Sequence, residues 1–274
     1  MPEVQTIVND LVQAGIVGCT IDRAEVFWGK TLADMDEACF NKLIPGHKIS
    51  SLARRGKHII FTLSSGLYIS VHLRMTGRLL LSKSTPKLSP YIRLRLHLRD
   101  NATLDYYDTR KFGRWNITKD LATVVGHIGP EPLESQFSGP ILFEMLGQHQ
   151  RALKPLLLDQ SFLAGLGNIY VDEALWDSCL HPLQPANTLR SIEAERLYQS
   201  ICKVLKRGLD SQGTTLGTGK TNYYRLDGTK GNHQTKLMVF RHTGEPCPRC
   251  GNTIIRLVVA QRSTHICPHC QKCP

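Results

Sequence analysis

Apolar and polar residues alternate over short stretches in the first half of the chain, and this period of two is that of β-strands. The stretch 91–99, YIRLRLHLR, places Ile or Leu at every second position with Arg or His between them. It predicts a half-buried strand with a basic outer face. The stretches 58–63 and 67–73 flank Ser-Ser-Gly and predict a hairpin, and Asp100–Asn101 predicts a turn into a strand at 104–107. Short strands at this spacing are typical of a β-sandwich.

A helical period replaces the alternation near the N-terminus and beyond about residue 140. Residues 4–14 predict a helix that precedes the strands. Residues 191–209 predict another helix with Ser191 as its N-cap. Its apolar stripe consists of Ile192, Leu197, Ile201 and Leu205. We expect this stripe to face a core.

Residues 156–176, LLLDQSFLAGLGNIYVDEALW, predict a helix, a turn and a second helix that begins at about Asn168. Gly165 and Gly167 in the turn let the backbone approach a ligand closely. The amides and the positive dipole end of the second helix make a candidate phosphate site. The alternative is the ordinary packing of a helical hairpin.

These patterns predict an α+β multidomain protein. We expect a β-sandwich domain with a leading helix at 1–127, a helical domain at 128–236 and a hairpin at 237–271. IGPEPL, residues 128–133, is the expected linker. The stretch 213–231 is rich in Gly and Thr without periodicity, and it predicts a mobile loop in the helical domain.

Composition and charge narrow the class of protein. The 41% of apolar residues can form buried cores, and no apolar run approaches the ~20 residues of a membrane helix. Because the N-terminus lacks the features of a signal peptide, we expect a cytoplasmic protein with no membrane partner. The net charge is +11, and residues 201–274 hold twelve Lys or Arg against three Asp or Glu. This distribution predicts a polyanionic partner, most simply nucleic acid, and a solvated basic surface is the alternative.

Four cysteines near the C-terminus carry the strongest chemical signal. Cys247, Cys250, Cys267 and Cys270 form two Cys-x-x-Cys pairs separated by sixteen residues, which is a zinc signature. Four thiolates satisfy tetrahedral Zn(II) and leave no open position, so the site is structural. We expect one zinc ion per chain, which stabilises a hairpin too small for its own core. A pair of disulfides, the alternative, fits a reducing compartment poorly.

Two further stretches mix cationic and bulky apolar residues at apparent turns. HLRMTGR (72–78) contains Met75, and DTRKFGRW (108–115) contains Arg110 and Phe112. Met75 and Phe112 could be core residues, or they could be wedges inserted between bases. Lys57 follows a glycine at the entrance of a strand, where a lone lysine is usually solvated.

The motifs together resemble one family. RRGK, HLRMTG, DTRKFG, IGPEPL, KPLLLDQ, LAGLGNIYVDE and the cysteine hairpin occur in this order in bacterial formamidopyrimidine-DNA glycosylases. The related endonuclease VIII branch shares the architecture, but HLRMTG, DTRKFG and GNIYVDE resemble the formamidopyrimidine branch. The resemblance implies an N-terminal β-sandwich, a helix–two-turn–helix in the helical domain and a C-terminal zinc-finger hairpin.

The resemblance also implies an activity. Members of this family are bifunctional DNA glycosylase/AP lyases that excise oxidised purines, 8-oxoguanine and formamidopyrimidines, and cleave the strand by β,δ-elimination. The implied partner is double-stranded damaged DNA, and the implied state is a monomer. The alternative is a damaged-DNA-binding protein of the same fold with impaired catalysis.

Four residues take catalytic roles from the resemblance. Pro2, exposed by loss of Met1, would attack the sugar of an extruded nucleotide. Glu3 would transfer protons, and Lys57 would assist β-elimination. Arg262 would act in the second elimination and bind phosphate.

The resemblance implies DNA contacts as well. Lys154 and Asn168 correspond to phosphate contacts, and Tyr91 stands where the family often has a phosphate-binding histidine. Met75, Arg110 and Phe112 would fill the gap left by the flipped base.

The chain departs from the family pattern at two places. It begins Met-Pro-Glu-Val-Gln-Thr, whereas the family usually begins Met-Pro-Glu-Leu-Pro-Glu-Val-x-Thr, so Pro2–Glu3 can align with either Pro-Glu pair. In the second alignment Pro2 lies in the first turn of the helix. The lesion-recognition loop after Thr215, LGTGKTNYYRLDG, is longer than usual and rearranged.

Overall fold

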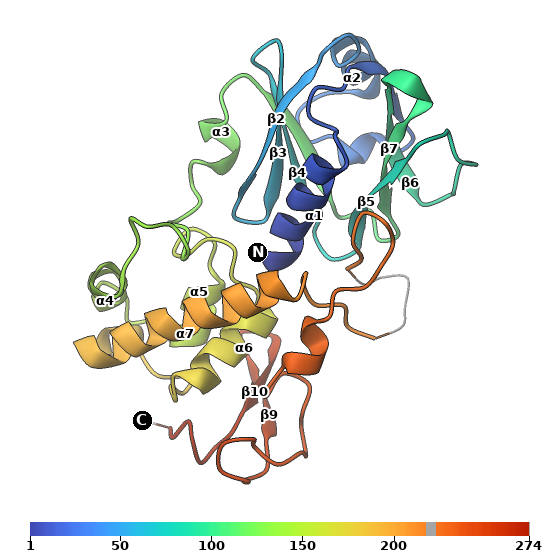
Figure 1. Ribbon diagram of the computed structural model, residues 1–274. Coiled ribbons are helices and arrows are strands. Elements are labelled where there is room, and N and C mark those ends of the chain that lie inside the picture. Colours follow the sequence, from blue (N-terminus) through green and yellow to red (C-terminus); the bar gives the residue numbers. More distant parts are fainter. Residues whose placement is uncertain (218–222, 274) are drawn as a thin grey trace. The chain divides into compact units, whose positions relative to one another are not determined.

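The computed structural model describes residues 1–217 and 223–273 (Figure 1). It divides into two compact units. The sandwich unit comprises residues 2–127 and 211–234, and the helical unit comprises Met1, residues 128–210 and the chain from 235 onward. The expected boundary at 127/128 coincides with a boundary between units, whereas 211–234 packs with the sandwich unit. Residues 218–222 of the expected mobile loop lie outside the described residues, and the three functional domains remain a prediction.

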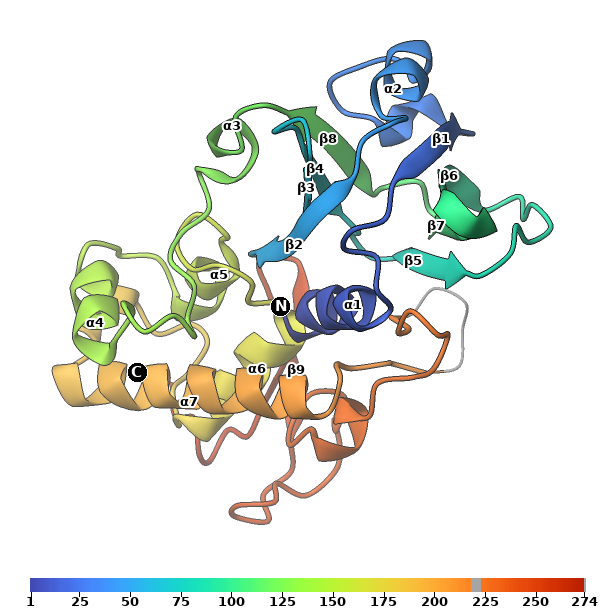
Figure 2. The same cartoon turned by 45° about the horizontal axis from the view of Figure 1, so that its top comes forward.

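Two antiparallel four-stranded sheets form the sandwich unit (Figure 2). One sheet has the order β1-β6-β7-β5, with β1 Ile21–Val26, β6 Ile92–Leu98, β7 Thr103–Asp108 and β5 Gly77–Ser82. The other has the order β2-β3-β4-β8, with β2 Ile49–Arg55, β3 His58–Leu63, β4 Tyr68–His72 and β8 Arg114–Thr118. The helical segments are α1 Pro2–Gln13, η1 Gly29–Thr31, α2 Glu37–Leu43, η2 Arg99–Asn101 and α3 Ala122–Val125. The predicted sandwich, its hairpins and its leading helix are confirmed.

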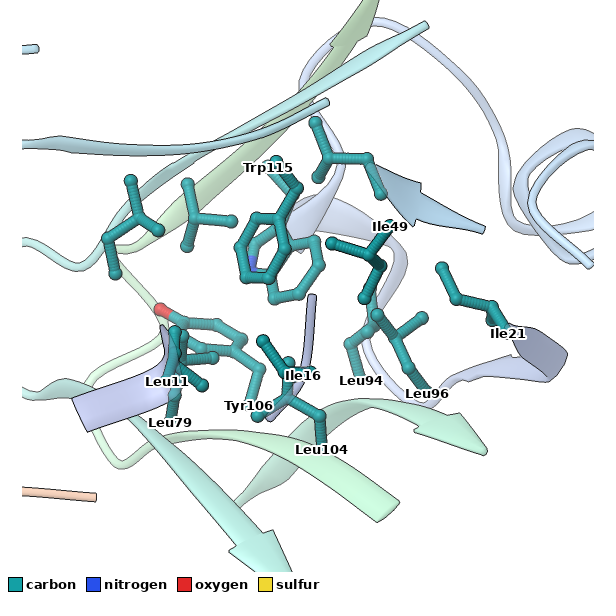
Figure 3. Packing of buried hydrophobic residues seen from close by; sticks show 14 of the residues in the cluster. Leu11, Ile16, Ile21, Ile49, Leu79, Leu94, Leu96, Leu104, Tyr106 and Trp115 are labelled. Atoms are coloured by element: carbon teal, nitrogen blue, oxygen red, sulfur yellow. The ribbon is translucent and has the colours of Figure 1, made fainter. Parts of the chain in front are cut away.

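The sandwich core lies between the two sheets and under α1 (Figure 3). Trp115 and Tyr106 are fully buried, with ring centroids 5.6 Å apart. The apolar face of α1 packs into this core through Val4, Ile7, Val8 and Leu11. Each such side chain contributes roughly 1.5–3 kcal/mol when fully buried. This burial fixes the orientation of α1 on the sandwich.

The prediction that β6 has a basic outer face is wrong. Arg93 and Arg95 are only 7% and 4% exposed. Arg95 donates to both carboxylate oxygens of Asp105 on β7, at 2.6 and 2.7 Å. Arg93 donates from Nε to the carbonyl of Asp108 at 2.7 Å. Because these partners satisfy the guanidinium groups, the arginines can be buried rather than solvated.

The helical unit contains α4 Gly139–Gly147, α5 Leu153–Leu158, α6 Asn168–Asp177, η3 Ala186–Thr188 and α7 Ser191–Asp210. η4, His233–Lys236, spans the junction between the units, and the hairpin strands are β9 Ile255–Val259 and β10 Arg262–Ile266. α7 packs against α4 and α6 (Figure 1). Leu197, Ile201 and Leu205 are fully buried as expected, but Ile192 is 67% exposed and is not part of the stripe. Among the described helices, none has the length and apolar character to cross a membrane.

Candidate nucleic-acid interface and zinc site

The four cysteine sulfurs of the hairpin gather at one point. All lie within 4.8 Å of one another, and three of their separations are 3.4, 3.5 and 3.9 Å. A tetrahedron with Zn–S bonds of about 2.3 Å has edges of about 3.8 Å, so the donor set fits zinc. The predicted structural zinc site, formed by Cys247, Cys250, Cys267 and Cys270, is confirmed. The closed set of ligands leaves no position for a substrate.

The zinc site supports a two-stranded hairpin with a strained tip. Arg262 pairs with Val259, and the two residues between them, Ala260 and Gln261, have φ of 48° and 60°. Two successive left-handed residues form the turn that matches the twist of a hairpin. Arg262 is therefore the first residue after the tip, and its side chain is exposed.

A buried network ties the hairpin to the helices. Lys154 of α5 is fully buried and donates to Asp172 of α6 at 2.5 Å and to the carbonyl of Ser263 at 3.0 Å. Asn168 donates from Nδ2 to the same carbonyl at 2.9 Å. Burial lowers the pKa of Lys154 below its usual range, although Asp172 opposes this shift. Lys154 Nζ thus joins α6 to the first residues of β10, and its predicted contact with phosphate stays a prediction.

A cationic pocket of about 440 Å³ lies beside this network. Its lining consists of Asn168, Phe240, Arg241, Arg256, Gln261, Arg262, Ser263 and His265. Three of these residues are arginines, and the lining contains no carboxylate. Asn168 is the first residue of α6, after the N-cap Gly167, so the positive end of the helix dipole lies here. Guanidinium groups and a helix N-terminus together suit a phosphate group.

Met75, Arg110 and Phe112 come together on the sandwich unit and form what we call the wedge cluster. Arg110 donates from Nη1 to the sulfur of Met75 at 3.3 Å, and its Cζ lies 4.8 Å from the Phe112 ring centre. Met75 is 66% exposed and Phe112 is 49% exposed. The alternative that they are core residues is therefore wrong.

Asp108 is a buried carboxylate that holds the backbone of the wedge cluster, and the sequence pattern did not predict this role. Its carboxylate is buried and accepts from the Thr76 hydroxyl, from the Arg110 amide at 3.1 Å, from the Gly113 amide at 2.9 Å and from the Tyr106 hydroxyl at 3.1 Å. Burial favours the neutral acid, but these donors outweigh it and hold the pKa of Asp108 below its usual range. The only sequence signal was its place as first residue of the DTRKFG motif.

Lys57 and Tyr91 also belong to the sandwich unit. Lys57 lies in the turn between β2 and β3, after Gly56 with a φ of 56°, and is half-buried. Nearby, burial lowers the pKa of His72 to about 3, helped by the charges of His58, Arg74 and Lys57. Tyr91 is 40% exposed and packs against Tyr107, with ring centroids 5.4 Å apart.

Pro2 and Glu3 lie at the start of α1. Pro2 is buried and is the first residue of the helix, which is its place in the second alignment of the N-terminus. The Glu3 carboxylate accepts from the Thr214 amide at 3.1 Å. Met1 is 5% exposed, and its amino group donates to the Gly165 carbonyl at 2.9 Å. In this form the nitrogen of Pro2 is a peptide nitrogen, so the predicted nucleophile requires removal of Met1.

The zinc hairpin, the cationic pocket and the wedge cluster define a zinc-finger protein that acts on nucleic acid. Three family models match the chain: the formamidopyrimidine-DNA glycosylase N-terminal domain at residues 1–115, the H2TH domain of the same enzymes at 128–220, and the zinc finger found in FPG and IleRS at 244–272. The chain belongs to the formamidopyrimidine-DNA glycosylase family. Its function is that of a DNA glycosylase of base excision repair.

Individual members of this family match the chain over nearly its whole length. A formamidopyrimidine-DNA glycosylase of Protochlamydia amoebophila is 53% identical over 272 residues, covering 99% of each chain. The crystal structure of the MutM (FPG) protein from Thermus thermophilus has a TM-score of 0.88 at 37% identity and covers 99% of this chain and 98% of its own. The complex of Lactococcus lactis FPG with a FAPY-dG containing DNA has a TM-score of 0.89 at 33% identity and covers 99% of each chain.

Proposed function

We propose that this glycosylase excises oxidised purines, 8-oxoguanine and formamidopyrimidines, from double-stranded DNA and then cleaves the strand as an AP lyase. The family membership along the whole chain carries this proposal, and the complex of the Lactococcus lactis relative with a FAPY-dG containing DNA supports the lesion class. The cationic pocket and the wedge cluster supply the two kinds of contact that the reaction needs. One kind binds backbone phosphates, and the other fills the space of an extruded nucleotide.

The proposed nucleophile is the secondary amine of Pro2 after removal of Met1. An ordinary α-amino group has a pKa of about 7.7–8, so an appreciable fraction is the free base near neutral pH. The nitrogen lone pair attacks C1′ of the extruded nucleotide, and the glycosidic bond breaks. The bonding electrons leave with the damaged base, which takes up a proton. Opening of the sugar ring gives an iminium ion that links Pro2 to the DNA.

The iminium ion then drives strand cleavage. Loss of a C2′ proton to a base breaks the C3′–O bond and expels the 3′ phosphate, which is β-elimination. A second proton loss expels the 5′ phosphate from C5′, which is δ-elimination. Water hydrolyses the remaining imine, so that the amine is regenerated and the sugar fragment is released.

Three further residues take catalytic roles in this proposal. Glu3 transfers protons as the sugar ring opens, and Lys57 assists β-elimination from the turn between β2 and β3. Arg262 binds the departing phosphate during the second elimination. The zinc ion supplies no chemistry to these steps. Its four thiolates hold the hairpin that carries Arg262.

The remaining predicted residues bind or deform the DNA. Asn168 faces phosphate from the N-terminus of α6, and Lys154 supports this site through the Ser263 carbonyl. Tyr91 contacts the backbone on the sandwich unit. Met75, Arg110 and Phe112 insert into the gap, and the stacking they provide offsets part of the few kcal/mol that extrusion costs. In this proposal the protein acts as a monomer on double-stranded DNA in the cytoplasm.

Borohydride trapping tests the mechanism, because only an amine that forms an imine with DNA becomes covalently linked on reduction. Protein shown by mass spectrometry to begin at Pro2 should be trapped on duplexes with 8-oxoguanine or an abasic site, and peptide mapping should locate the link at Pro2. Pro2→Gly, which replaces the secondary amine by a primary amine, should be trapped more slowly.

The competing function is a damaged-DNA-binding protein of the same fold whose catalysis is impaired by the shortened N-terminus. Met1 is buried with its amino group bonded to Gly165, so retained Met1 would leave no amine on Pro2. Tight binding to damaged duplex without any trapped complex, from protein that begins at Pro2, would establish the binding protein. A link mapped to a different residue would refute the role of Pro2 alone.

A further inference from the structure

Arg241 has a backbone conformation that arginine rarely adopts. Its φ is 69°, in the left-handed region. The His242 amide donates to the Val239 carbonyl at 3.1 Å, so residues 239–242 form a β-turn with Arg241 at the third position. A positive φ at this position is typical of type II turns, where glycine or asparagine is favoured. The chain thus has an arginine where the backbone favours glycine.

Buried contacts fix this turn. The carboxylate of Glu173, which is 4% exposed, accepts from the amides of Met238, Val239 and Phe240 at 2.9 Å each. The Phe240 ring packs against His265, with ring centroids 4.8 Å apart. Strained backbone persists where the surrounding structure over-determines it, and it is concentrated at functional sites. The buried anchors therefore hold Arg241 in a conformation that its own side chain disfavours.

The exposed side chain of Arg241 lines the cationic pocket together with Arg256 and Arg262. Arg241 follows the segment held by Glu173, whereas Arg256 and Arg262 lie on the two strands of the zinc hairpin. Separate parts of the chain thus bring three arginines to the lining of one pocket that has no carboxylate. Like charges gathered in this way repel one another, and an anion between them removes the repulsion.

We propose that Arg241 is a phosphate-binding residue. It binds a backbone phosphate of the bound DNA strand in addition to those that Asn168 and Arg262 bind. The inference rests on the proposed function, because it takes DNA as the occupant of the pocket. The left-handed turn places Arg241 in the lining of the pocket at a cost in stability. Replacing Arg241 by glycine should therefore stabilise the fold and weaken DNA binding at the same time.

The test measures binding of the full-length zinc-loaded protein to two duplexes, one undamaged and one with a tetrahydrofuran abasic site, between 50 and 200 mM NaCl. Each phosphate contact contributes about 0.9 to the slope of log K against log salt. Arg241→Gly should lose about one such contact on both duplexes and bind about tenfold more weakly near 0.1 M salt. Its Tm should rise by about 2–4 °C, because the strained residue is gone.

Two variants serve as controls. Arg241→Lys keeps the cation and should keep the salt slope, and Arg190→Gln removes an exposed arginine of the helical unit that does not line the pocket and should keep it too.

The outcomes separate this inference from the proposed function. If Arg241→Gly bound DNA with the salt slope and affinity of the wild type while Arg262→Ala had a reduced slope, the role of Arg241 would be overturned. The proposed function would stand. A raised Tm with unchanged binding would show that the arginine has no role in recognition. Absence of damaged-duplex binding in the wild type would instead refute the proposed function.

Discussion

Asp108→Asn tests whether one buried carboxylate holds the wedge cluster. The substitution keeps the shape of the side chain but replaces one acceptor oxygen by an NH₂ donor. Four groups now donate to the carboxylate: the Thr76 hydroxyl, the Arg110 and Gly113 amides, and the Tyr106 hydroxyl. One oxygen accepts from Gly113 and Tyr106, and the other accepts from Arg110 and Thr76. A hydroxyl can rotate to accept from the new NH₂ group, whereas a backbone amide cannot. One backbone amide, of Gly113 or of Arg110, therefore loses its acceptor, and the other bonds lose their charge assistance.

The expected loss of folding stability is large for one substitution. A hydrogen bond to a charged group contributes about 1.5–3 kcal/mol, and a buried donor without a partner costs about 1–3 kcal/mol. We therefore expect the free energy of unfolding of the sandwich unit to fall by about 2–4 kcal/mol. The loss should be smaller in acid. Because the folded-state pKa of Asp108 is lowered, its contribution is present above the unfolded pKa of about 3.9 and is lost as the pH falls through the folded value.

Urea unfolding monitored by tryptophan fluorescence provides the assay, since Trp115 packs against Tyr106 in the same core. The difference between wild type and Asp108→Asn should be constant from pH 5 to 8 and should shrink below about pH 4. Asp100→Asn is the matched control, because Asp100 is an exposed turn residue with a φ of 66° that asparagine tolerates. A difference below about 0.5 kcal/mol at pH 7, the size of an ordinary surface effect, would refute the reasoning.

Four other predictions address the zinc site, the interface and the chemistry. Cys250→Ser should lose the bound zinc and DNA binding together, measured by metal analysis and anisotropy, and full affinity in metal-free protein would contradict this. Arg262→Ala should lower the salt slope by about 0.9, and an unchanged slope would remove Arg262 from the interface. Phe112→Ala should slow excision from duplex strongly and leave Tm nearly unchanged, because the ring is 49% exposed. A collapse in Tm with normal activity per folded molecule would refute this. Glu3→Gln should slow excision of 8-oxoguanine more than cleavage at a preformed abasic site, and equal slowing of both would contradict its proton-transfer role.

The sequence by itself determined the features whose geometry is local. The zinc ligands follow from two Cys-x-x-Cys pairs, because each pair and the hairpin between them bring the thiolates to one metal. The start of α6 at Asn168 follows from the glycines before it, which end one helix and allow the next to begin. The exposure of Met75 and Phe112 could not be read from their apolar character, but the cationic turns around them kept the wedge hypothesis open.

Tertiary structure decided what depends on distant partners. Alternation placed Arg93 and Arg95 on one face of β6 but could not show that Asp105 and the Asp108 carbonyl satisfy them in a buried layer. A lysine in a helix is usually exposed, and only the fold shows Lys154 buried against Asp172. The pocket shared by Arg241 and Arg262 has the same origin, because neither local propensity nor hydrophobic period specifies which separate segments meet. Whether a charged side chain can be buried depends on its partner, and each of these partners lies ten or more residues away in the sequence.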